Sequence, residues 1–393
     1  MTSPAPPRWL HLDWLRIIAF GLLVPYHVGM VFVSWPYHVK IGPAVTALEP
    51  WLRLASPWRM DLLFLVSGAA TAFMLQRQGA SNGLLLSERL RRLLWPLLVG
   101  VLVVVPPQAW VEVQQRFGFA GGYGEFMRLY LTGYGGFCDA PGRCLILPTW
   151  NHLWYLPYLA CYTALLWATL RRWPHALDNT AQAVTAWLAR RSRMAEVWLL
   201  LPVLPLLAGR WLLAGHFPPS HALVDDWMLH SQHGLMFLLG VLLASTPALR
   251  PLLVSQRWVA LAWAFAAWWL LVWGLPAGSA GAWKTLANSV QQWGAIVAAL
   301  GFADRHLQRD GRWRRLLGVA LFPLYILHQT LIVLGAWLLA RWLWPWPVQA
   351  ITLVLGTFAL GLLGAWWLGR WRWLRPAVGM KPLPAWAGRP PDR

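Results

Sequence analysis

Charged residues are scarce in this 393-residue sequence, and acidic residues are the scarcest of them. There are 14 Asp and Glu and 33 Lys and Arg, so charged residues form 12% of the chain, about half of the roughly 25% usual in soluble domains. Hydrophobic residues form 58% of the chain. This composition argues against a water-soluble fold, because the chain has too few polar residues to form a surface that covers its apolar residues.

Cysteine is also rare, with three residues in the chain and no cluster of the kind that binds zinc. Cys138 and Cys144 flank a turn sequence within one long segment between apolar runs. If that segment faces an oxidising compartment, we expect a Cys138–Cys144 disulfide rather than two free thiols. Cys161 lies in the middle of an apolar run, where a thiol usually packs as a small hydrophobic group.

Long apolar runs recur along almost the whole chain, and each predicts a membrane-spanning helix of about 20 residues. We expect an all-α integral membrane protein of about ten transmembrane helices. A single membrane domain would cover residues 1–375, followed by a short, basic, proline-rich tail at 376–393. The helices are predicted at 10–33, 58–76, 93–113, 152–171, 196–214, 227–246, 257–275, 283–303, 316–340 and 348–369.

The basic residues alternate between segments in the way that sets membrane topology. Of the 33 Lys and Arg, 23 lie in the amino end and in segments 77–92, 171–195, 247–257, 304–315 and 370–393. Such segments are cytoplasmic under the positive-inside rule, so both termini are predicted in the cytoplasm. Topology thus accounts for the net charge of +19. No basic cluster is interleaved with a stacking platform, and nucleic acid is not an expected partner.

Three connecting segments carry further expectations. The first apolar run contains Asp13, Arg16 and His27 and lacks a signal-peptide cleavage site, so it should remain as the first helix. Residues 173–195 form either a short amphipathic helix on the inner leaflet, ending in basic residues, or a solvated linker. Residues 114–151 contain several glycines and predict an ordered cap with tight turns.

Ionisable residues within the predicted spans are costly to insert and therefore candidates for function. Arg16 and His27 are eleven residues apart in the first helix, which places them about 20° apart around the axis and roughly 16 Å apart along it. Asp13 joins the same stripe and is expected to orient Arg16. Histidine suits proton transfer near neutral pH, and arginine suits phosphate binding. The alternative is a polar seam between helices.

Other polar residues occur at depths that allow a shared site. They are Arg59 and Asp61 at the start of the second span, His152 at the start of the fourth, His230 and His233 in the sixth, and His328 in the ninth. Taken singly, each is more often a hydrogen-bonded structural residue. The spacing of His230 and His233 also suits metal ligands, but no further ligand stands at a recognisable spacing, and we predict no metal site.

Four segments resemble the acyltransferase-3 family of integral membrane acyltransferases. They occur in order along the first nine spans: Arg16-x10-His27 within Leu12-Asp13-Trp14-Leu15-Arg16, Asp61-Leu-Leu-Phe-Leu-Val-Ser67-Gly68, His152-Leu-Trp154-Tyr-Leu, and Phe322-Pro323-Leu-Tyr325-Ile-Leu-His328-Gln329. The resemblance implies a ten-helix fold that takes an acyl group from cytoplasmic acyl-CoA. It also implies that His27 and Arg16 are the residues tied to activity.

The resemblance extends to a branch of that family. Many sugar O-acetylating members carry a glutamate shortly after the His-Leu-Trp motif, whereas this chain has Leu156-Pro157-Tyr158-Leu159. The segments beginning at Asn151 and Phe322 look more like the glucan-modifying branch, which includes succinyltransferases of periplasmic glucans.

The resulting hypothesis is a multi-pass enzyme of a bacterial inner membrane that moves an acetyl or succinyl group to a hydroxyl of a periplasmic or surface glycan. Acyl-CoA would be a co-substrate, with no permanently bound cofactor. Arg16 would hold the phosphates of coenzyme A and His27 would act as the base, with Asp13, Arg59, Asp61, His152, Trp154 and His328 in supporting roles. The alternative is a transporter or flippase for a glycan or a lipid-linked intermediate.

Overall fold

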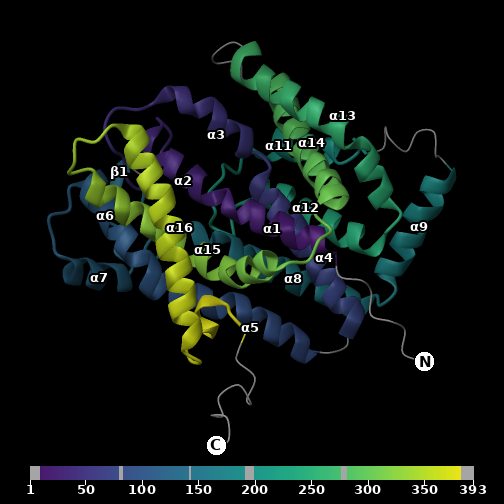
Figure 1. The fold of residues 1–393 in the computed structure, drawn as a ribbon, viewed down its shortest axis with the longest axis horizontal. Helices are drawn as coiled ribbons and strands as arrows, with labels where there is room; N and C mark the ends of the chain where they lie inside the picture. Colours follow the sequence, from purple (N-terminus) through teal and green to yellow (C-terminus); the bar gives the residue numbers. More distant parts are fainter. Residues whose placement is uncertain (1–8, 79–82, 141–142, 191–198, 276–280, 382–393) are drawn as a thin grey trace, which may run out of the picture. The chain divides into compact units, whose positions relative to one another are not determined.

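The computed structural model describes residues 9–78, 83–140, 143–190, 199–275 and 281–381, most of which are helical (Figure 1). Within these ranges, eight helical stretches are long and apolar enough to cross a membrane. The prediction of an all-α membrane protein is confirmed. The eight stretches are Leu10–Phe32, Thr46–Gln76, Leu86–Phe117, Asn151–Arg172, Trp227–Ser245, Leu249–Gly274, Arg312–Leu339 and Trp346–Arg370.

Two of the ten predicted spans, at 196–214 and 283–303, are not among these eight stretches. In the range 196–214, the structure has a shorter apolar helix, α11 (Val203–Leu213), and residues 191–198 lie outside the described residues. In the range 283–303, α14 (Ala282–His306) has 25 residues, about 37 Å of helix, which exceeds the roughly 30 Å of a bilayer core. Polar residues such as Gln291 and Gln292 lower its hydropathy.

The backbone is arranged as two compact units, each built from three stretches of chain. Unit 1 comprises Met1–Leu22, Glu49–Arg89 and Tyr158–Arg314. Unit 2 comprises Leu23–Leu48, Leu90–Pro157 and Arg315–Arg393. Three of the five boundaries fall within α5 (Gly83–Val99), α8 (Tyr155–Arg172) and α15 (Arg312–Leu339), so each of these helices contributes residues to both units.

Unit 1 is built on two closely packed helix pairs, α4 with α12 and α13 with α14; the members of the second pair run side by side in Figure 1. Small residues permit this closeness, as in many membrane helix pairs. A Cβ on Gly68 of α4 would fall against the carbonyl oxygen of Phe237, and one on Gly240 of α12 against that of Leu65. The helices are α1 (Leu10–Gly21), α3 (Glu49–Ala55), α4 (Arg59–Gln78), α9 (Ala176–Arg190), α11, α12 (Trp227–Ser245), α13 (Leu249–Trp269), which continues into the π-helical turn η5 (Leu270–Gly274), and α14.

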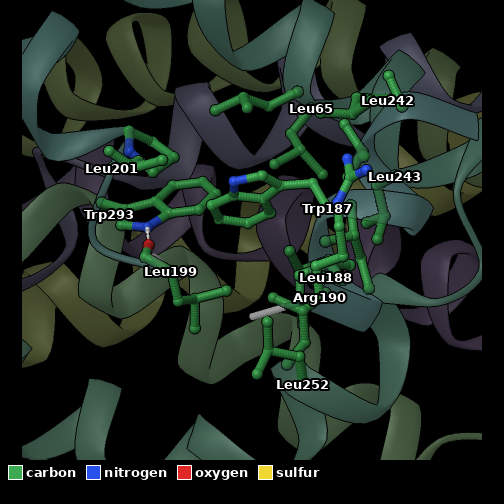
Figure 2. Close-up of a pocket in the computed structure, with 17 residues that line it drawn as sticks. Leu65, Trp187, Leu188, Arg190, Leu199, Leu201, Leu242, Leu243, Leu252 and Trp293 are labelled. Carbon is green, nitrogen blue, oxygen red and sulfur yellow. Dashed lines mark hydrogen bonds between the residues drawn. The ribbon is translucent and has the colours of Figure 1, made fainter. Parts of the chain in front are cut away.

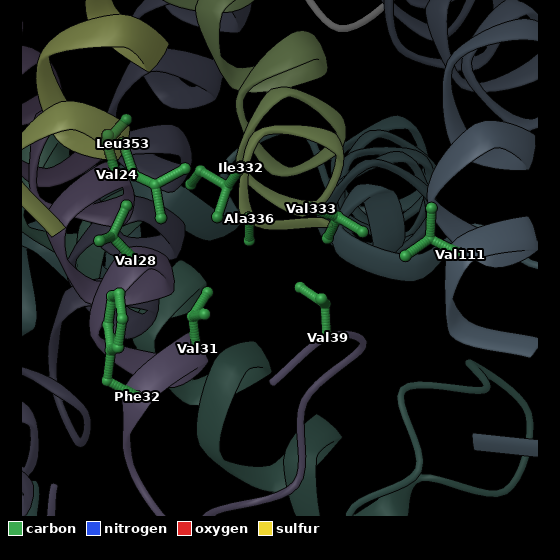
Figure 3. Packing of buried hydrophobic residues seen from close by; sticks show 10 residues of the cluster. All are labelled: Val24, Val28, Val31, Phe32, Val39, Val111, Ile332, Val333, Ala336 and Leu353. Atoms are coloured by element: carbon green, nitrogen blue, oxygen red, sulfur yellow. The ribbon is translucent and has the colours of Figure 1, made fainter. Parts of the chain in front are cut away.

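Unit 2 packs around an aliphatic cluster drawn from α2, α6, α15 and α16 (Figure 3). Val24 and Val28 on α2 lie close to Ile332 on α15 and Leu353 on α16. These side chains are almost completely buried, so they form the centre of the unit. Its further elements are α2 (Leu23–Phe32), η1 (Thr46–Leu48), η2 (Gly100–Val104), α6 (Val105–Phe117), α7 (Tyr123–Leu131), β1 (Cys138–Ala140), β2 (Arg143–Cys144), η3 (Asn151–Trp154), α16 (Trp346–Arg370) and η6 (Pro376–Val378).

The first predicted span is interrupted at Leu22, which separates α1 from α2. Pro25 explains the interruption, because it lacks the backbone N–H that would bond to the carbonyl of Gly21 in a continuous helix. After α2, the ammonium group of Lys40 donates hydrogen bonds to the carbonyls of Met30, Val33 and Trp35. Lys40 thereby caps the carboxyl end of α2 and fixes the loop that follows it.

The segment predicted as a cap contains a helix and a pair of short strands in its described residues. Strands β1 and β2 pair antiparallel, and Cys138 is joined to Cys144 by a disulfide. Arg116, at the end of α6, donates to the Asp139 carboxylate from Nε at 3.2 Å and also from a terminal nitrogen. This interaction lowers the pKa of Asp139. An aromatic cluster beneath includes buried Phe126 and Tyr130.

The segment at 173–195 is helical over α9, none of whose residues is buried. The structure thus favours the helix over the linker for residues 176–190. Arg191 and Arg193, at the predicted basic end, lie outside the described residues. Of the predicted basic tail, residues 382–393 lie outside them too.

Replacing Gly240 with alanine tests the close α4–α12 packing. The added Cβ meets a backbone carbonyl that cannot move without shifting α4, so we expect the free energy of unfolding to fall by about 1–3 kcal/mol. Gly356→Ala on α16 is the control, because nothing lies within 4 Å of its added Cβ. Thermal unfolding in detergent measures both. Equal melting temperatures for Gly240→Ala and the unchanged protein would contradict the packing.

Candidate active site

The candidate site in unit 2 is centred on two histidines, His27 of α2 and His328 of α15. Nδ1 of His27 lies 3.0 Å from Nε2 of His328, and the two ring planes are inclined by 24° with centroids 5.1 Å apart. The ring of Tyr37 lies near that of His27, with centroids 6.0 Å apart. The structure therefore brings together two residues that the sequence places 301 positions apart.

His152 joins this pair through reciprocal bonds between η3 and α15. Its Nε2 lies 2.9 Å from the carbonyl oxygen of Ile326, and the Tyr325 hydroxyl donates to the carbonyl of His152 at 2.8 Å. The His152 and His328 rings meet edge to face at 5.0 Å. His152 and His328 are both buried. These bonds hold η3 and the His328 turn of α15 in one fixed arrangement.

The hydrogen-bond partners determine which nitrogen of each neutral ring carries the proton. Nδ1 of His328 lies 2.6 Å from the carbonyl oxygen of Tyr325, which can only accept, so Nδ1 is the protonated nitrogen. Nε2 of His328 then accepts, and Nδ1 of His27 must donate to it. Nε2 of His27 consequently carries the lone pair, which is the state that a general base requires.

A chain of polar side chains extends from His152 through residues that were not predicted from the sequence. Gln108 lies 3.5 Å from Nδ1 of His152, and the amide of Gln329 donates to Gln108 at 3.1 Å. The Gln329 amide also lies 2.8 Å from Nε2 of His38. Nδ1 of His38 in turn lies 2.5 Å from the Glu112 carboxylate.

The donors and acceptors of this chain match at each step. Gln329 supplies its two N–H groups to Gln108 and His38, and His38 supplies its Nδ1–H to Glu112. One sequence signal points to Glu112, since it is a carboxylate within the predicted span 93–113. Glutamines and a loop histidine give no comparable signal.

Asp61, another predicted supporting residue, lies in a buried network of unit 1. Its carboxylate lies 2.7 Å from Nδ1 of His233 on α12 and accepts a hydrogen bond of 2.6 Å from Gln292 on α14. The ring of Phe64 stacks on His233 with centroids 4.6 Å apart. Internal partners of this kind are what a carboxylate needs when it is buried away from water. The network links the three helices that carry these residues.

His230 and His233 serve different partners despite their metal-like spacing. Nδ1 of His230 accepts from the Tyr162 hydroxyl at 2.8 Å, and Nε2 donates to the carbonyl of Leu223 at 2.5 Å. The nearby Asp226 accepts from the Tyr158 hydroxyl at 2.7 Å. Across the part of the chain that the structure describes, no group of three or more His, Cys, Asp or Glu residues is placed to hold a metal ion.

The expected pairing of Asp13 with Arg16 requires correction. Asp13 accepts a hydrogen bond of 2.7 Å from Arg314 at the start of α15, and Nε of Arg314 donates to Asp310 at 2.8 Å. The guanidinium group of Arg314 has several N–H donors, so it can bind the carboxylates of Asp310 and Asp13 at the same time. The Arg16 guanidinium lies 6.0 Å from the ring of Phe20, and its Nε has no hydrogen-bond partner among the described residues.

The predicted site residues are therefore divided between the units. His27, His152, Trp154 and His328 belong to unit 2, where Trp154 is half-buried. Asp13, Arg16, Arg59 and Asp61 belong to unit 1, where Arg59 is buried. Arg16 lies on α1 and His27 on α2, and their separation of roughly 16 Å stays a prediction.

A family model described as an acyltransferase domain matches residues 9–370. No curated protein and no solved structure matches the chain. The matched range includes α1 to α16, and thus the described networks of both units.

Replacing Glu112 with leucine tests the polar chain of unit 2. The substitution removes the acceptor of the His38 Nδ1–H and of Arg116, and an unsatisfied buried donor costs about 1–3 kcal/mol. We expect a lower melting temperature in detergent. Glu112→Gln keeps an acceptor oxygen and should lose less. If both variants unfold at the same temperature, the hydrogen bonds of Glu112 do not contribute to the stability of unit 2 as described.

The loop histidine His221 gives unit 1 a pH-dependent stability. Burial, followed by the nearby His233, lowers the pKa of His221 from 6.5 to about 4, against the opposing effect of Asp226. Below pH 6.5 the unfolded chain binds a proton that the folded chain does not, so stability falls as the pH drops from 6.5 towards 4. Above pH 6.5 His221 is neutral in both states and contributes no pH dependence.

His221→Asn should flatten this part of the stability profile, because asparagine does not titrate and tolerates the backbone φ of 57° at this position. Melting temperatures between pH 7.5 and pH 5 provide the measurement. His216→Asn, at an exposed loop position, should leave the slope unchanged. A profile for His221→Asn that parallels the unchanged protein would contradict the prediction.

Proposed function

The chain belongs to the acyltransferase-3 family and is a membrane acyltransferase, and we propose that it acylates a glycan. The donor is cytoplasmic acyl-CoA, the group transferred is acetyl or succinyl, and the acceptor is a hydroxyl of a periplasmic or surface glycan. The proposed location is a bacterial inner membrane. The resemblance of the His152 and His328 segments to the glucan-modifying branch supports this choice of acceptor.

The hydrogen bond between His27 and His328 is the observation that carries the proposed mechanism. It leaves the lone pair on Nε2 of His27, so that this nitrogen takes the proton of the acceptor hydroxyl as the hydroxyl oxygen attacks the thioester carbonyl. His328 acts as a positioning residue, since it fixes both the tautomer and the orientation of His27. The role parallels that of the third member of a catalytic triad.

In the reaction the acyl group moves from the thioester sulfur of acyl-CoA to the hydroxyl oxygen of the acceptor. Attack forms a C–O bond and a tetrahedral oxyanion, and collapse of the oxyanion breaks the C–S bond. The proton held by His27 passes to the departing thiolate of coenzyme A. In this proposal Arg16 binds the coenzyme A phosphates, for which a guanidinium offers charge and paired donors. No bound cofactor is needed for these steps.

A covalent route uses the same nitrogen differently. Nε2 of His27 attacks the thioester first, and the acyl-histidine then passes its acyl group to the acceptor hydroxyl. Rapid quench with radiolabelled acyl-CoA separates the two routes. Label that remains on the protein before acceptor is added supports the covalent route, and its absence at times shorter than one turnover supports direct transfer.

The glycan acceptor is tested in a deletion strain by mass spectrometry of its periplasmic and surface glycans. We expect loss of an acetyl or succinyl mass from an otherwise complete glycan. Restoration of that mass by the intact gene, but not by the gene encoding His27→Ala, ties the change to the enzyme. Loss of the entire glycan would contradict acylation and support a transporter.

His27→Ala should reduce acyl transfer by roughly 10²–10⁴-fold, the usual contribution of a general base. Transfer of labelled acyl groups in membranes, normalised to the amount of protein, provides the measurement. His216→Ala is the matched control, because it removes an exposed loop histidine. Full activity of His27→Ala would exclude the assigned role.

His328→Leu should reduce kcat by roughly 10²-fold, because His27 loses the acceptor that fixes its tautomer. His328→Gln retains an acceptor oxygen and should recover part of the loss. The dependence of kcat on pH distinguishes positioning from general stability, since the acidic limb should shift in His328→Leu. An unchanged pH profile in His328→Leu would contradict the positioning role.

A further inference from the structure

Unit 1 contains an apolar cavity of about 610 Å³ beside α9 (Figure 2). Its size is within the range of roughly 300–1,000 Å³ typical of small-molecule sites. Leucines and the indole rings of Trp187 and Trp293 dominate its lining. The indole N–H of Trp293 donates to the carbonyl of Leu199 at 2.6 Å, so this polar group is bonded to the protein. The cavity is therefore suited to a hydrocarbon chain.

The cavity lies near one end of two membrane-spanning helices of unit 1. Its lining includes Leu239 and Leu243 near the carboxyl end of α12, and Leu249 and Leu252 at the amino end of α13. These ends are joined by a short connection, so they lie at the same level. Leu65, from within α4, lines a part nearer the middle of that helix. The cavity thus runs from the ends of spans inward.

The position of α9 marks this level as a membrane surface. The helix lies against α12, has no buried residues, and turns Val184, Trp187 and Leu188 towards the cavity. At the end of the preceding α8, the guanidinium of Arg172 lies 5.4 Å from the ring of Trp173. Tryptophan and arginine together are typical of the interface between lipid and water.

Arg190 is the single charged residue among those described as lining the cavity, and it is the last residue of α9. It is exposed, and no ion pair or hydrogen bond joins it to another described residue. The neighbouring Arg250 on α13, by contrast, pairs with Asp304 at 2.5 Å. Arg190 therefore places a positive charge that is unpaired within the described residues beside an apolar chamber.

We propose that this cavity binds an anionic phospholipid from the surrounding leaflet. An acyl chain occupies the apolar chamber, and the headgroup phosphate pairs with Arg190 at the interface. Hydrocarbon and phosphate are recognised by separate parts of the site, which fits an amphipathic lipid better than a water-soluble metabolite. The site is independent of the acyl-transfer proposal, because none of the residues assigned to that reaction lines it.

Native mass spectrometry of the purified full-length protein tests the proposal with phosphatidylglycerol and phosphatidylcholine. We expect one phosphatidylglycerol to remain bound under conditions that remove phosphatidylcholine. Arg190→Gln should lower this preference about fivefold, the effect of one arginine near an anionic surface. Arg172→Gln is the matched control, since Arg172 does not line the cavity, and it should retain the preference.

Filling the chamber provides the second test. Ala183→Trp and Val184→Trp each place an indole at the cavity wall and should reduce retention of both lipids. Unaltered elution and melting temperature verify that each variant is folded. Equal retention of the two lipids by the unchanged protein would overturn the proposal, and so would full retention of phosphatidylglycerol by both folded tryptophan variants or by Arg190→Gln.

Discussion

A polar side chain within an apolar helix bundle must find its hydrogen-bond partner inside the protein. Water is not available to it in the bilayer core, and an unsatisfied buried group costs a large part of the stability of a protein. This requirement arranges the interior of both units. In unit 1 it places His233 and Gln292 around the Asp61 carboxylate, and in unit 2 it connects His27 to His328. These pairings join helices in addition to the apolar packing between them.

Much of the fold was predictable because lipid imposes simple rules on sequence. Apolar runs of sufficient length mark spans, and eight of the predicted spans coincide with helices of suitable length and hydropathy among the described residues. The interruption at Leu22 also has a sequence cause in Pro25, although periodicity alone favoured one helix over 10–33. The polar helix α14 is harder to recognise, because its glutamines bond to other helices rather than to lipid.

Site residues were predictable from the sequence only where the side chain is ionisable, because such a group is costly to place in an apolar helix. His27, His152 and His328 are ionisable groups in apolar surroundings, and the structure brings their segments together. Gln108, which contacts His152, and Gln329, which contacts Gln108, are neutral, so their cost in an apolar helix gives no comparable signal. The hydrogen-bond partners of charged residues could not be predicted from the sequence either. Asp13 bonds to Arg314 rather than to the nearby Arg16, because neighbours in a bundle depend on packing between distant helices.

The two glutamines in the polar chain of unit 2 affect how protons can travel. A row of histidines and a carboxylate in a membrane protein risks forming a wire through which protons leak down their gradient. An amide group has no proton to release at physiological pH. Gln329 and Gln108 interrupt the hydrogen-bonded route between Glu112 and His152. Proton transfer along this route therefore stops at the two amides, which isolates the Glu112 carboxylate from the proposed base His27.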